Sequence, residues 1–148
     1  MKIEVLAPLT GQLISIDGVN DPVFSQRMMG DGFAIIPEET SVYAPFDATI
    51  EVLFPTGHAI GLKSANGLEM LIHIGIDTVN SKSGSFKAAI KQGQQVKKGD
   101  LLVEFNEKKL KAEGYDLVTV CIFLSGQKLS PVKTGHVIHS TPLSLETQ

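Results

Sequence analysis

The stretch that decides the fold runs from residue 56 to residue 77 and reads TGHAIGLKSANGLEMLIHIGID. Two apolar segments flank the pair Asn66-Gly67, and Asn-Gly between apolar runs is a strong signal for a β-hairpin. Each segment carries one histidine, His58 and His73. With a loop of two or four residues the two histidines share a face of the hairpin, and only an odd-length loop separates them. We therefore predict two imidazoles side by side.

The surroundings of His73 favour a functional site over a pair of ordinary strand histidines. One face of the second segment is apolar and is expected to face the core; it comprises Met70, Ile72, Ile74 and Ile76. His73 is on the other face, with Asp77 and with Gly75, which leaves room for a partner to approach the ring. Thr56 precedes His58 by two positions, so its hydroxyl could hold one ring nitrogen of His58. Such a polar cluster indicates a site without naming its chemistry.

Composition describes one soluble globular domain over residues 1–148. Hydrophobic residues make up 43% and charged residues 20%, and a net charge of −3 argues against nucleic acid as a partner. The single cysteine, Cys121, lies in an apolar run, so we expect it to fill the core of a protein from a reducing compartment. No signal peptide and no apolar stretch of membrane-spanning length is evident. We expect a cytoplasmic protein that does not insert into a membrane.

Short apolar segments separated by turns predict an all-β protein, an antiparallel sandwich or small barrel. The predicted strands cover residues 3–6, 12–16, 33–36, 41–43, 49–54, 58–63, 70–74, 101–105, 118–124 and 137–138. Two short helices are indicated, at residues 86–92 and 107–114, and the tail beyond Ser140 is expected to be loosely held. The turn at Ala7-Pro8 is repeated at Ala44-Pro45, which suggests two similar halves.

Several segments together resemble a known family. They are residues 7–11, 21–32, 44–47, 54–61, 67–79 and 92–100. In these segments the chain resembles the glucose-type enzyme IIA component of the bacterial phosphoenolpyruvate-dependent sugar phosphotransferase system. The resemblance implies a single domain with an antiparallel β-sandwich or flattened barrel called the duplicated hybrid motif. Residues 127–148 match nothing in it, and Ala48 stands where the family has glycine, so the turn there must avoid a left-handed conformation.

The resemblance also implies a phosphotransferase activity and assigns roles. His73 would accept a phosphoryl group from the phosphohistidine of the carrier HPr and pass it to a cysteine of a sugar-specific IIB domain. His58 would stabilise the phosphoryl group, Thr56 would orient His58, and Asp21 and Asp77 would flank the site. An apolar docking surface is implied at Val23, Phe24, Met28, Met29, Phe54 and Leu71. The family resemblance leaves room for regulatory protein targets as well.

Two other classes fit less well. A zinc peptidase would use His73 and Asp77 with a later His-x-His, but His136 and His139 are separated by two residues. A biotin or lipoyl carrier would need a lysine at a hairpin tip, where this chain has Asn66. No cofactor is required by the phosphocarrier hypothesis. Two adjacent imidazoles make half of a zinc site, so we expect at most weak or interfacial Zn²⁺ binding at His58 and His73.

Overall fold

The computed structural model describes residues 1–82 and 84–148, and in this part of the chain nearly all regular structure is β. The strands are β1 (Lys2–Leu6), β2 (Gly11–Ser15), β3 (Gly32–Pro37), β4 (Ser41–Tyr43), β5 (Ala48–Leu53), β6 (Ala59–Lys63), β7 (Glu69–Ile74), β8 (Phe86–Ala88), β9 (Gln95–Val96), β10 (Leu101–Phe105), β11 (Thr119–Phe123), β12 (Gly135–Val137) and β13 (Pro142–Glu146). The helices are short: η1 (Ile16–Gly18), α1 (Pro22–Ser25), η2 (Thr78–Asn80) and α2 (Glu107–Ala112).

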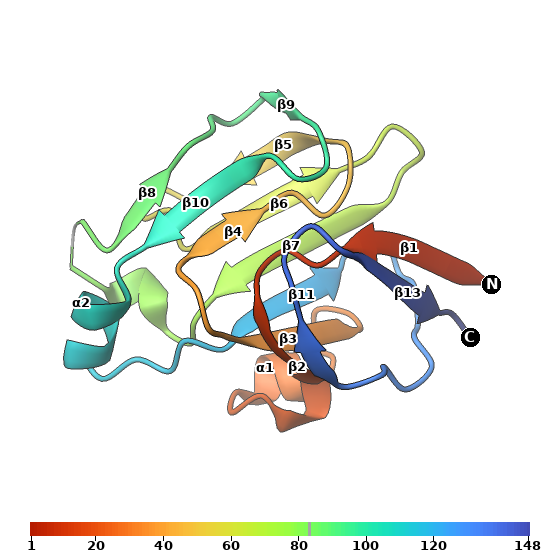
Figure 1. Cartoon of the computed structure of the whole chain (residues 1–148), viewed down its shortest axis with the longest axis horizontal. Helices are drawn as coiled ribbons and strands as arrows, with labels where there is room; N and C mark the ends of the chain where they lie inside the picture. The colour runs from red at the N-terminus through yellow and green to blue at the C-terminus, as the bar shows by residue number, and fades with distance from the viewer. Residues whose placement is uncertain (83) are drawn as a thin grey trace.

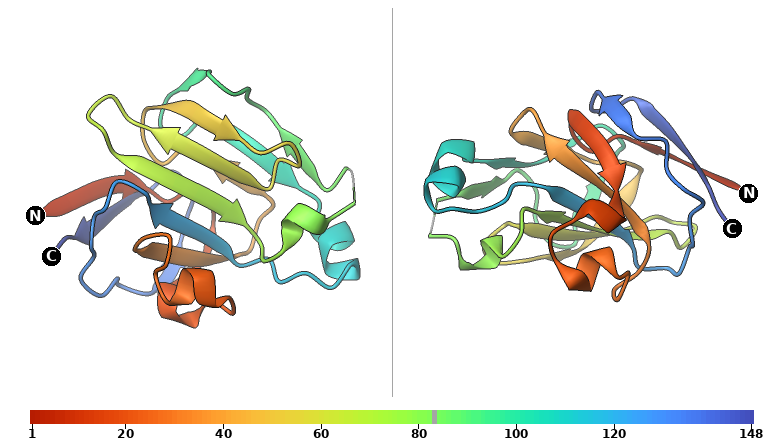
Figure 2. Two further views of the ribbon diagram at one scale, coloured as in Figure 1. Left: turned by 180° about the vertical axis from the view of Figure 1, so that it is seen from behind. Right: turned by 90° about the horizontal axis from the view of Figure 1, so that it is seen from below.

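Two antiparallel sheets face each other and a small third sheet closes one end. The large sheet has the order β12-β2-β3-β11-β7-β6-β5-β9, and a three-stranded sheet, β4-β10-β8, covers one side of it (Figure 1). Residues such as Ile60, Ile72 and Leu102 fill the space between the sheets. A second apolar cluster, which includes Leu71 and Val120, lies on the outer face of the large sheet beneath α1 (Figure 2). The predicted antiparallel β-sandwich is confirmed.

The two Ala-Pro turns exchange backbone hydrogen bonds, as two similar halves would. The amide of Leu6 donates to the carbonyl of Pro45 at 2.8 Å, and the amide of Tyr43 donates to the carbonyl of Pro8 at 2.7 Å. Leu6 and Tyr43 occupy the same place before their respective turns. Ala48 starts β5 without a positive φ, as its Cβ requires.

Every predicted strand is present, with ends shifted by at most two residues, and so is the helix at α2. The predicted helix at residues 86–92 is wrong, because residues 86–88 form β8 and pair with β10. Backbone pairing to an existing sheet edge overrides a weak local helix preference. Cys121 is fully buried between the sheets, and this burial raises the pKa of its thiol.

The C-terminal tail is held more firmly than the sequence suggested. β13 pairs with β1 from Leu6↔Pro142 to Lys2↔Glu146, and Leu145 is buried in the core between the sheets. The expectation of a loose tail beyond Ser140 is therefore wrong. The alternation of Leu143 and Leu145 was the available signal, but a lone strand at the end of a chain has no neighbouring turn to reveal its partner.

Candidate functional site

The hairpin that carries the two histidines closes with an odd loop, contrary to the prediction. Lys63 pairs with Glu69, and the amide of Ser64 donates to the carbonyl of Leu68 at 2.8 Å. The three residues between Ser64 and Leu68 form the loop, and Gly67 at its end has a φ of 91°. This is the three-residue loop in which a type I turn is followed by a left-handed glycine. In this register His73 lies opposite Ala59, so the alternation of the strand alone would put His58 on the other face of the hairpin.

The two imidazoles meet nevertheless, because His58 lies just outside the regular ladder. A turn precedes β6, with Gly57 at a φ of 82° and the Gly57 amide bonded to the carbonyl of Phe54. The carbonyl of His58 still accepts from the amide of Ile74 at 2.7 Å, while the ring reaches the ring of His73. The centroids of the His58 and His73 rings are 4.9 Å apart and the ring planes cross at 80°. The predicted adjacency is confirmed for a different reason.

The backbone fixes which nitrogen of His73 carries a proton. Nδ1 of His73 lies 2.7 Å from the carbonyl oxygen of Gly75. A carbonyl can only accept, so Nδ1 is the donor, and in the neutral ring the lone pair is on Nε2. The ring is half-buried beside His58. Nε2 is therefore the nitrogen of His73 that carries the lone pair while Nδ1 is bonded to the Gly75 carbonyl.

The sequence suggested that Gly75 leaves an open space beside His73, but the structure shows that this position is crowded. It has a φ of 77°, and a Cβ on this residue would lie 2.5 Å from Cγ2 of Thr78 and 2.9 Å from the carbonyl oxygen of Asp116. The hydroxyl of Thr78 in turn donates to the carbonyl of Ile74 at 2.5 Å. Glycine is needed here because the chain turns sharply after β7 and aims the Gly75 carbonyl back at His73.

The loop before β6 supplies the hydrogen bond that holds His58. The residue is nearly inaccessible, with 3% of its surface exposed. The hydroxyl of Thr56 forms a hydrogen bond with Nδ1 of His58, the contact that the sequence predicted. The ring of Phe54 lies 5.3 Å from the His58 ring, and that of Phe86 lies 6.4 Å away. If the Thr56 hydroxyl donates to Nδ1, the proton of the neutral His58 ring is on Nε2.

Burial keeps both imidazoles neutral at physiological pH. Desolvation, helped by the neighbouring His73, lowers the pKa of His58 from 6.5 to about 4. Desolvation also lowers the pKa of His73, while the Gly75 carbonyl and the carboxylates of Asp21 and Asp77 oppose this shift. A neutral ring keeps the lone pair that a nucleophile needs. The two acidic residues thus lie close enough to act on His73 by charge.

Each acidic residue belongs to a short helical segment that flanks the histidine pair. The carboxylate of Asp21 caps α1, accepting from the amide of Val23 at 3.0 Å, and Pro22 occupies the first turn. Asp77 precedes η2 with a φ of 60°. No helix was predicted at α1, although Asp-Pro before Val-Phe is a recognisable helix start.

The predicted apolar docking surface is partly exposed and partly buried. Val23, Met28, Met29 and Phe54 are exposed, with 41%, 69%, 42% and 37% of their surface accessible. The expectation is wrong for Phe24 and Leu71, which are buried. Phe24 instead packs against the His73 ring at a centroid distance of 5.1 Å, and Leu71 belongs to the outer apolar cluster. The helical turn of α1, which was not predicted, turns the side chain of Phe24 inward.

Two residues near the site escaped the sequence analysis. Val79 in η2, two residues after Asp77, is 51% exposed. Phe86, at the start of β8 in the three-stranded sheet, has its ring 6.4 Å from the His58 ring. An apolar residue following a turn was the only signal for Val79, and nothing local to residue 86 predicts its contact with a strand far away in sequence.

The residues that could ligate a metal ion are scattered in the part of the chain that the structure describes. No group of three or more His, Cys, Asp or Glu side chains in residues 1–82 and 84–148 is arranged to hold a metal ion. The histidines that a zinc peptidase would need are engaged elsewhere: Nε2 of His136 lies 2.8 Å from a carboxylate oxygen of Glu38, and His139 stacks on Tyr43 with centroids 4.0 Å apart.

Comparison with known families shows which class of protein has this fold and this site. Residues 3–129 match the family described as phosphoenolpyruvate-dependent sugar phosphotransferase system, EIIA 1, and the chain belongs to this family. It is a phosphocarrier of the sugar phosphotransferase system. In the described residues, no helix is long and apolar enough to cross a membrane.

Three known proteins and one solved structure are similar to this chain over most of its length. The glucose-specific EIIA component of Halalkalibacterium halodurans is 44% identical over 126 residues, which cover 85% of this chain and 73% of that protein. The corresponding protein of Staphylococcus epidermidis is 38% identical over 131 residues, covering 88% and 79%. The glucose-specific EIICBA component of Streptococcus pneumoniae is 41% identical over 144 residues, covering 95% of this chain and 20% of that protein. The structure of glucose permease IIA from Mycoplasma capricolum superimposes with a TM-score of 0.90 at 36% identity, covering 98% of this chain and 96% of that one.

Proposed function

We propose that Nε2 of His73 is the atom that receives the phosphoryl group, from the phosphohistidine of HPr. The hydrogen bond from Nδ1 of His73 to the Gly75 carbonyl carries this proposal, because it leaves the lone pair on Nε2. In the transfer, Nε2 attacks phosphorus as the bond from phosphorus to the donor nitrogen breaks, and the electron pair of that bond returns to the donor ring. No proton has to leave His73, so the step depends mainly on positioning and charge stabilisation.

His58 would stabilise the moving phosphoryl group. The Thr56 hydroxyl at Nδ1 favours a proton on Nε2 of His58, and this N–H can then donate to a phosphoryl oxygen. The buried position of His58 supports this role, because a hydrogen bond is stronger in a water-poor environment and the donor is already oriented. Thr56 is thus proposed as the residue that sets the orientation and tautomer of His58.

The acceptor is proposed to be a cysteine of a IIB domain. Its thiolate would attack phosphorus while the bond to Nε2 of His73 breaks. A partner of this kind is supported by the Streptococcus pneumoniae relative, whose name, EIICBA, joins an A component to B and C components. Sugar uptake and phosphorylation would follow in the permease, and the chain would act in the cytoplasm, where HPr is expected.

Both partners would dock on the apolar residues around the histidine pair. We propose Val23, Met28, Met29 and Phe54 for this surface and add Val79, which is exposed beside Asp77. Exposed apolar residues around a polar centre are typical of transient protein interfaces. Asp21 and Asp77 would attract basic groups on the partner and tune how readily phosphate leaves His73. Regulatory protein targets could use the same surface.

No cofactor is needed for this chemistry. Zn²⁺ is proposed to bind only weakly at His58 and His73, and more tightly where a partner protein supplies further ligands.

The proposal is tested by incubating the chain with phosphoenolpyruvate, enzyme I and HPr and measuring its mass. The wild type should gain one phosphoryl group, His73→Gln should gain none, and His136→Gln, which removes a histidine paired with Glu38 away from the site, should behave as wild type. Normal phosphorylation of the His73→Gln variant would contradict the assignment.

A further inference from the structure

The loop between α1 and β3 carries two exposed apolar side chains. Met28 is 69% exposed and Met29 42%. They follow Arg27, a residue other than glycine that adopts a left-handed φ of 58°. Only the surrounding contacts can hold a side-chain-bearing residue in that conformation.

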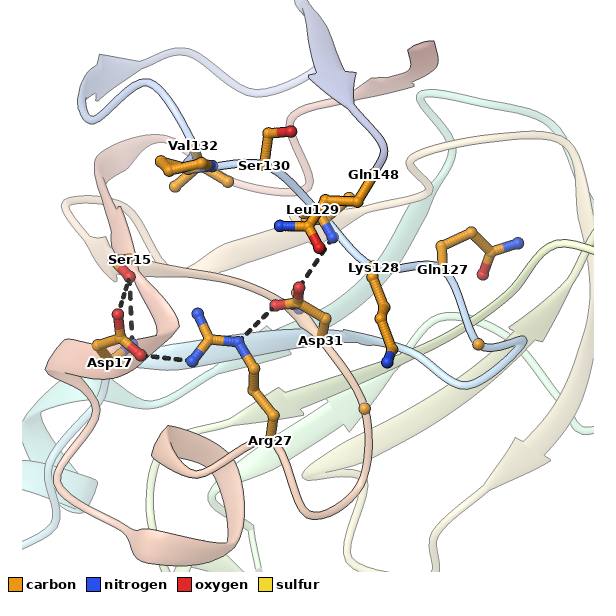
Figure 3. Close-up of a pocket in the computed structure, with 14 residues that line it drawn as sticks. Ser15, Asp17, Arg27, Asp31, Gln127, Lys128, Leu129, Ser130, Val132 and Gln148 are labelled. Carbon is orange, nitrogen blue, oxygen red and sulfur yellow. Dashed lines mark hydrogen bonds and ion pairs between the residues drawn. The ribbon is translucent and has the colours of Figure 1, made fainter. Parts of the chain in front are cut away.

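The guanidinium of Arg27 bridges two parts of the fold. Nη1 lies 2.5 Å from a carboxylate oxygen of Asp17 in η1, and Nε donates to Asp31, just before β3, at 3.0 Å (Figure 3). The other oxygen of Asp31 accepts from the amide of Leu129 at 2.8 Å. The bond to Arg27 lowers the pKa of Asp17, so this arm persists to acidic pH. One side chain thus links η1, the start of β3 and the C-terminal segment.

The bridge lies at the edge of a cavity, toward residues 126–132. Arg27 and Asp31 border a cavity of about 630 Å³ that is also lined by Asp17, Lys128 and Gln148 (Figure 3). Neither His58 nor His73 lines it. Close to α1, the loop is held by the amides of Arg27 and Met28, which donate to Phe24 and Val23. Farther along, the charged bridge supplies the support.

We propose that Arg27 is a positioning residue for docking of the phosphoryl donor: its bridge between Asp17 and Asp31 holds Met28 and Met29 in the orientation that the donor contacts. This inference rests on the proposed function, since it deepens the account of the same docking surface. Two carboxylates already neutralise the charge of Arg27, so we do not assign it a direct contact with the donor. Loss of the bridge would leave the histidine pair intact and make the loop mobile before docking.

The variant Arg27→Asn tests this directly. Asparagine tolerates the left-handed conformation but cannot reach both carboxylates, so the backbone is spared and the bridge is lost. The donor would then have to order the methionines on binding, so we expect the KM for phospho-HPr to rise about 3- to 10-fold with kcat unchanged. The control Lys111→Gln, which breaks the exposed pair with Glu107 on α2, removes the same charge and should leave KM unchanged.

Two further measurements keep the proposal falsifiable. In a double-mutant cycle, Arg27→Asn should add little to the KM effect of Met28→Ala, because both act through the same side chain; additive effects would overturn the proposal. Methyl NMR of Met28 and Met29 should show sharper, averaged signals in Arg27→Asn; unchanged methyl signals would also overturn it. This NMR measurement needs no phosphoryl transfer, so a wild type that takes up no phosphate would refute the proposed function while the role of the bridge is still judged.

Discussion

Replacing Gly75 by alanine should damage both the stability and the site. The φ of 77° is a left-handed conformation, which costs alanine about 1–2 kcal/mol relative to its preferred regions. The new Cβ would also lie 2.5 Å from Cγ2 of Thr78 and 2.9 Å from the Asp116 carbonyl, and overpacking of this kind costs about 1–3 kcal/mol. We therefore expect Gly75→Ala to lower the free energy of unfolding by about 2–5 kcal/mol.

Gly67→Ala is a matched control for the backbone part of this loss. Gly67 has a φ of 91°, but nothing lies within 4 Å of the position that a Cβ would take, so only the conformational cost of about 1–2 kcal/mol should remain. Urea denaturation at neutral pH measures both variants, and phosphoryl uptake from HPr should fall in Gly75→Ala alone, because the displaced carbonyl no longer orients His73. If both variants lose the same stability and both keep full uptake, the role assigned to Gly75 is refuted.

Three further predictions concern the histidine pair. His58→Gln should still accept phosphate from HPr but pass it slowly to IIB, as single-turnover transfer assays would measure; complete failure to accept phosphate would indicate exchanged roles. Burial lowers the pKa of His58 from 6.5 to about 4, so protonation of this ring opposes folding. The stability that neutral His58 contributes is complete above pH 6.5 and is lost as pH falls towards 4. Between pH 7 and 4.5 the free energy of unfolding, measured with urea, should therefore fall by about 2–3 kcal/mol more in the wild type than in His58→Gln, and equal falls would contradict the shift. Zn²⁺ should bind weakly, perturb the ring signals of His58 and His73 in NMR, and inhibit phosphorylation; tight zinc whose removal unfolds the protein would contradict this.

The strands were predictable because alternation of apolar and polar residues is a local property. Met70, Ile72 and Ile74 marked β7 and its core face, and the structure buries all three. The histidine pair was located by the same reasoning, yet the register was wrong. Asn-Gly favours both two-residue and three-residue loops, and a difference of one residue exchanges the faces. The turn at Gly57, which restores the contact between the rings, depends on the bond between the Gly57 amide and Phe54 and was not visible in the sequence.

Several of the features that were missed depend on distant partners. β8 and β13 form because β10 and β1 offer them an edge, and neither short strand has a strong pattern of its own. The buried state of Phe24 follows from the single helical turn of α1, which aims the ring at His73. Asp31, one partner of Arg27, also accepts from the amide of Leu129, which is far away in the sequence. This contact could not be predicted from the residues around Arg27.

The position of phosphorus on the modified chain tests the central claim most directly. The chain labelled with ¹⁵N in its histidine rings can be phosphorylated through HPr and studied by NMR, where coupling between phosphorus and nitrogen identifies the bonded atom. The hydrogen bond from Nδ1 of His73 to the Gly75 carbonyl predicts a phosphoryl group on Nε2 of His73, with Nδ1 still protonated. Phosphorus on Nδ1 of His73, or on either nitrogen of His58, would contradict the account.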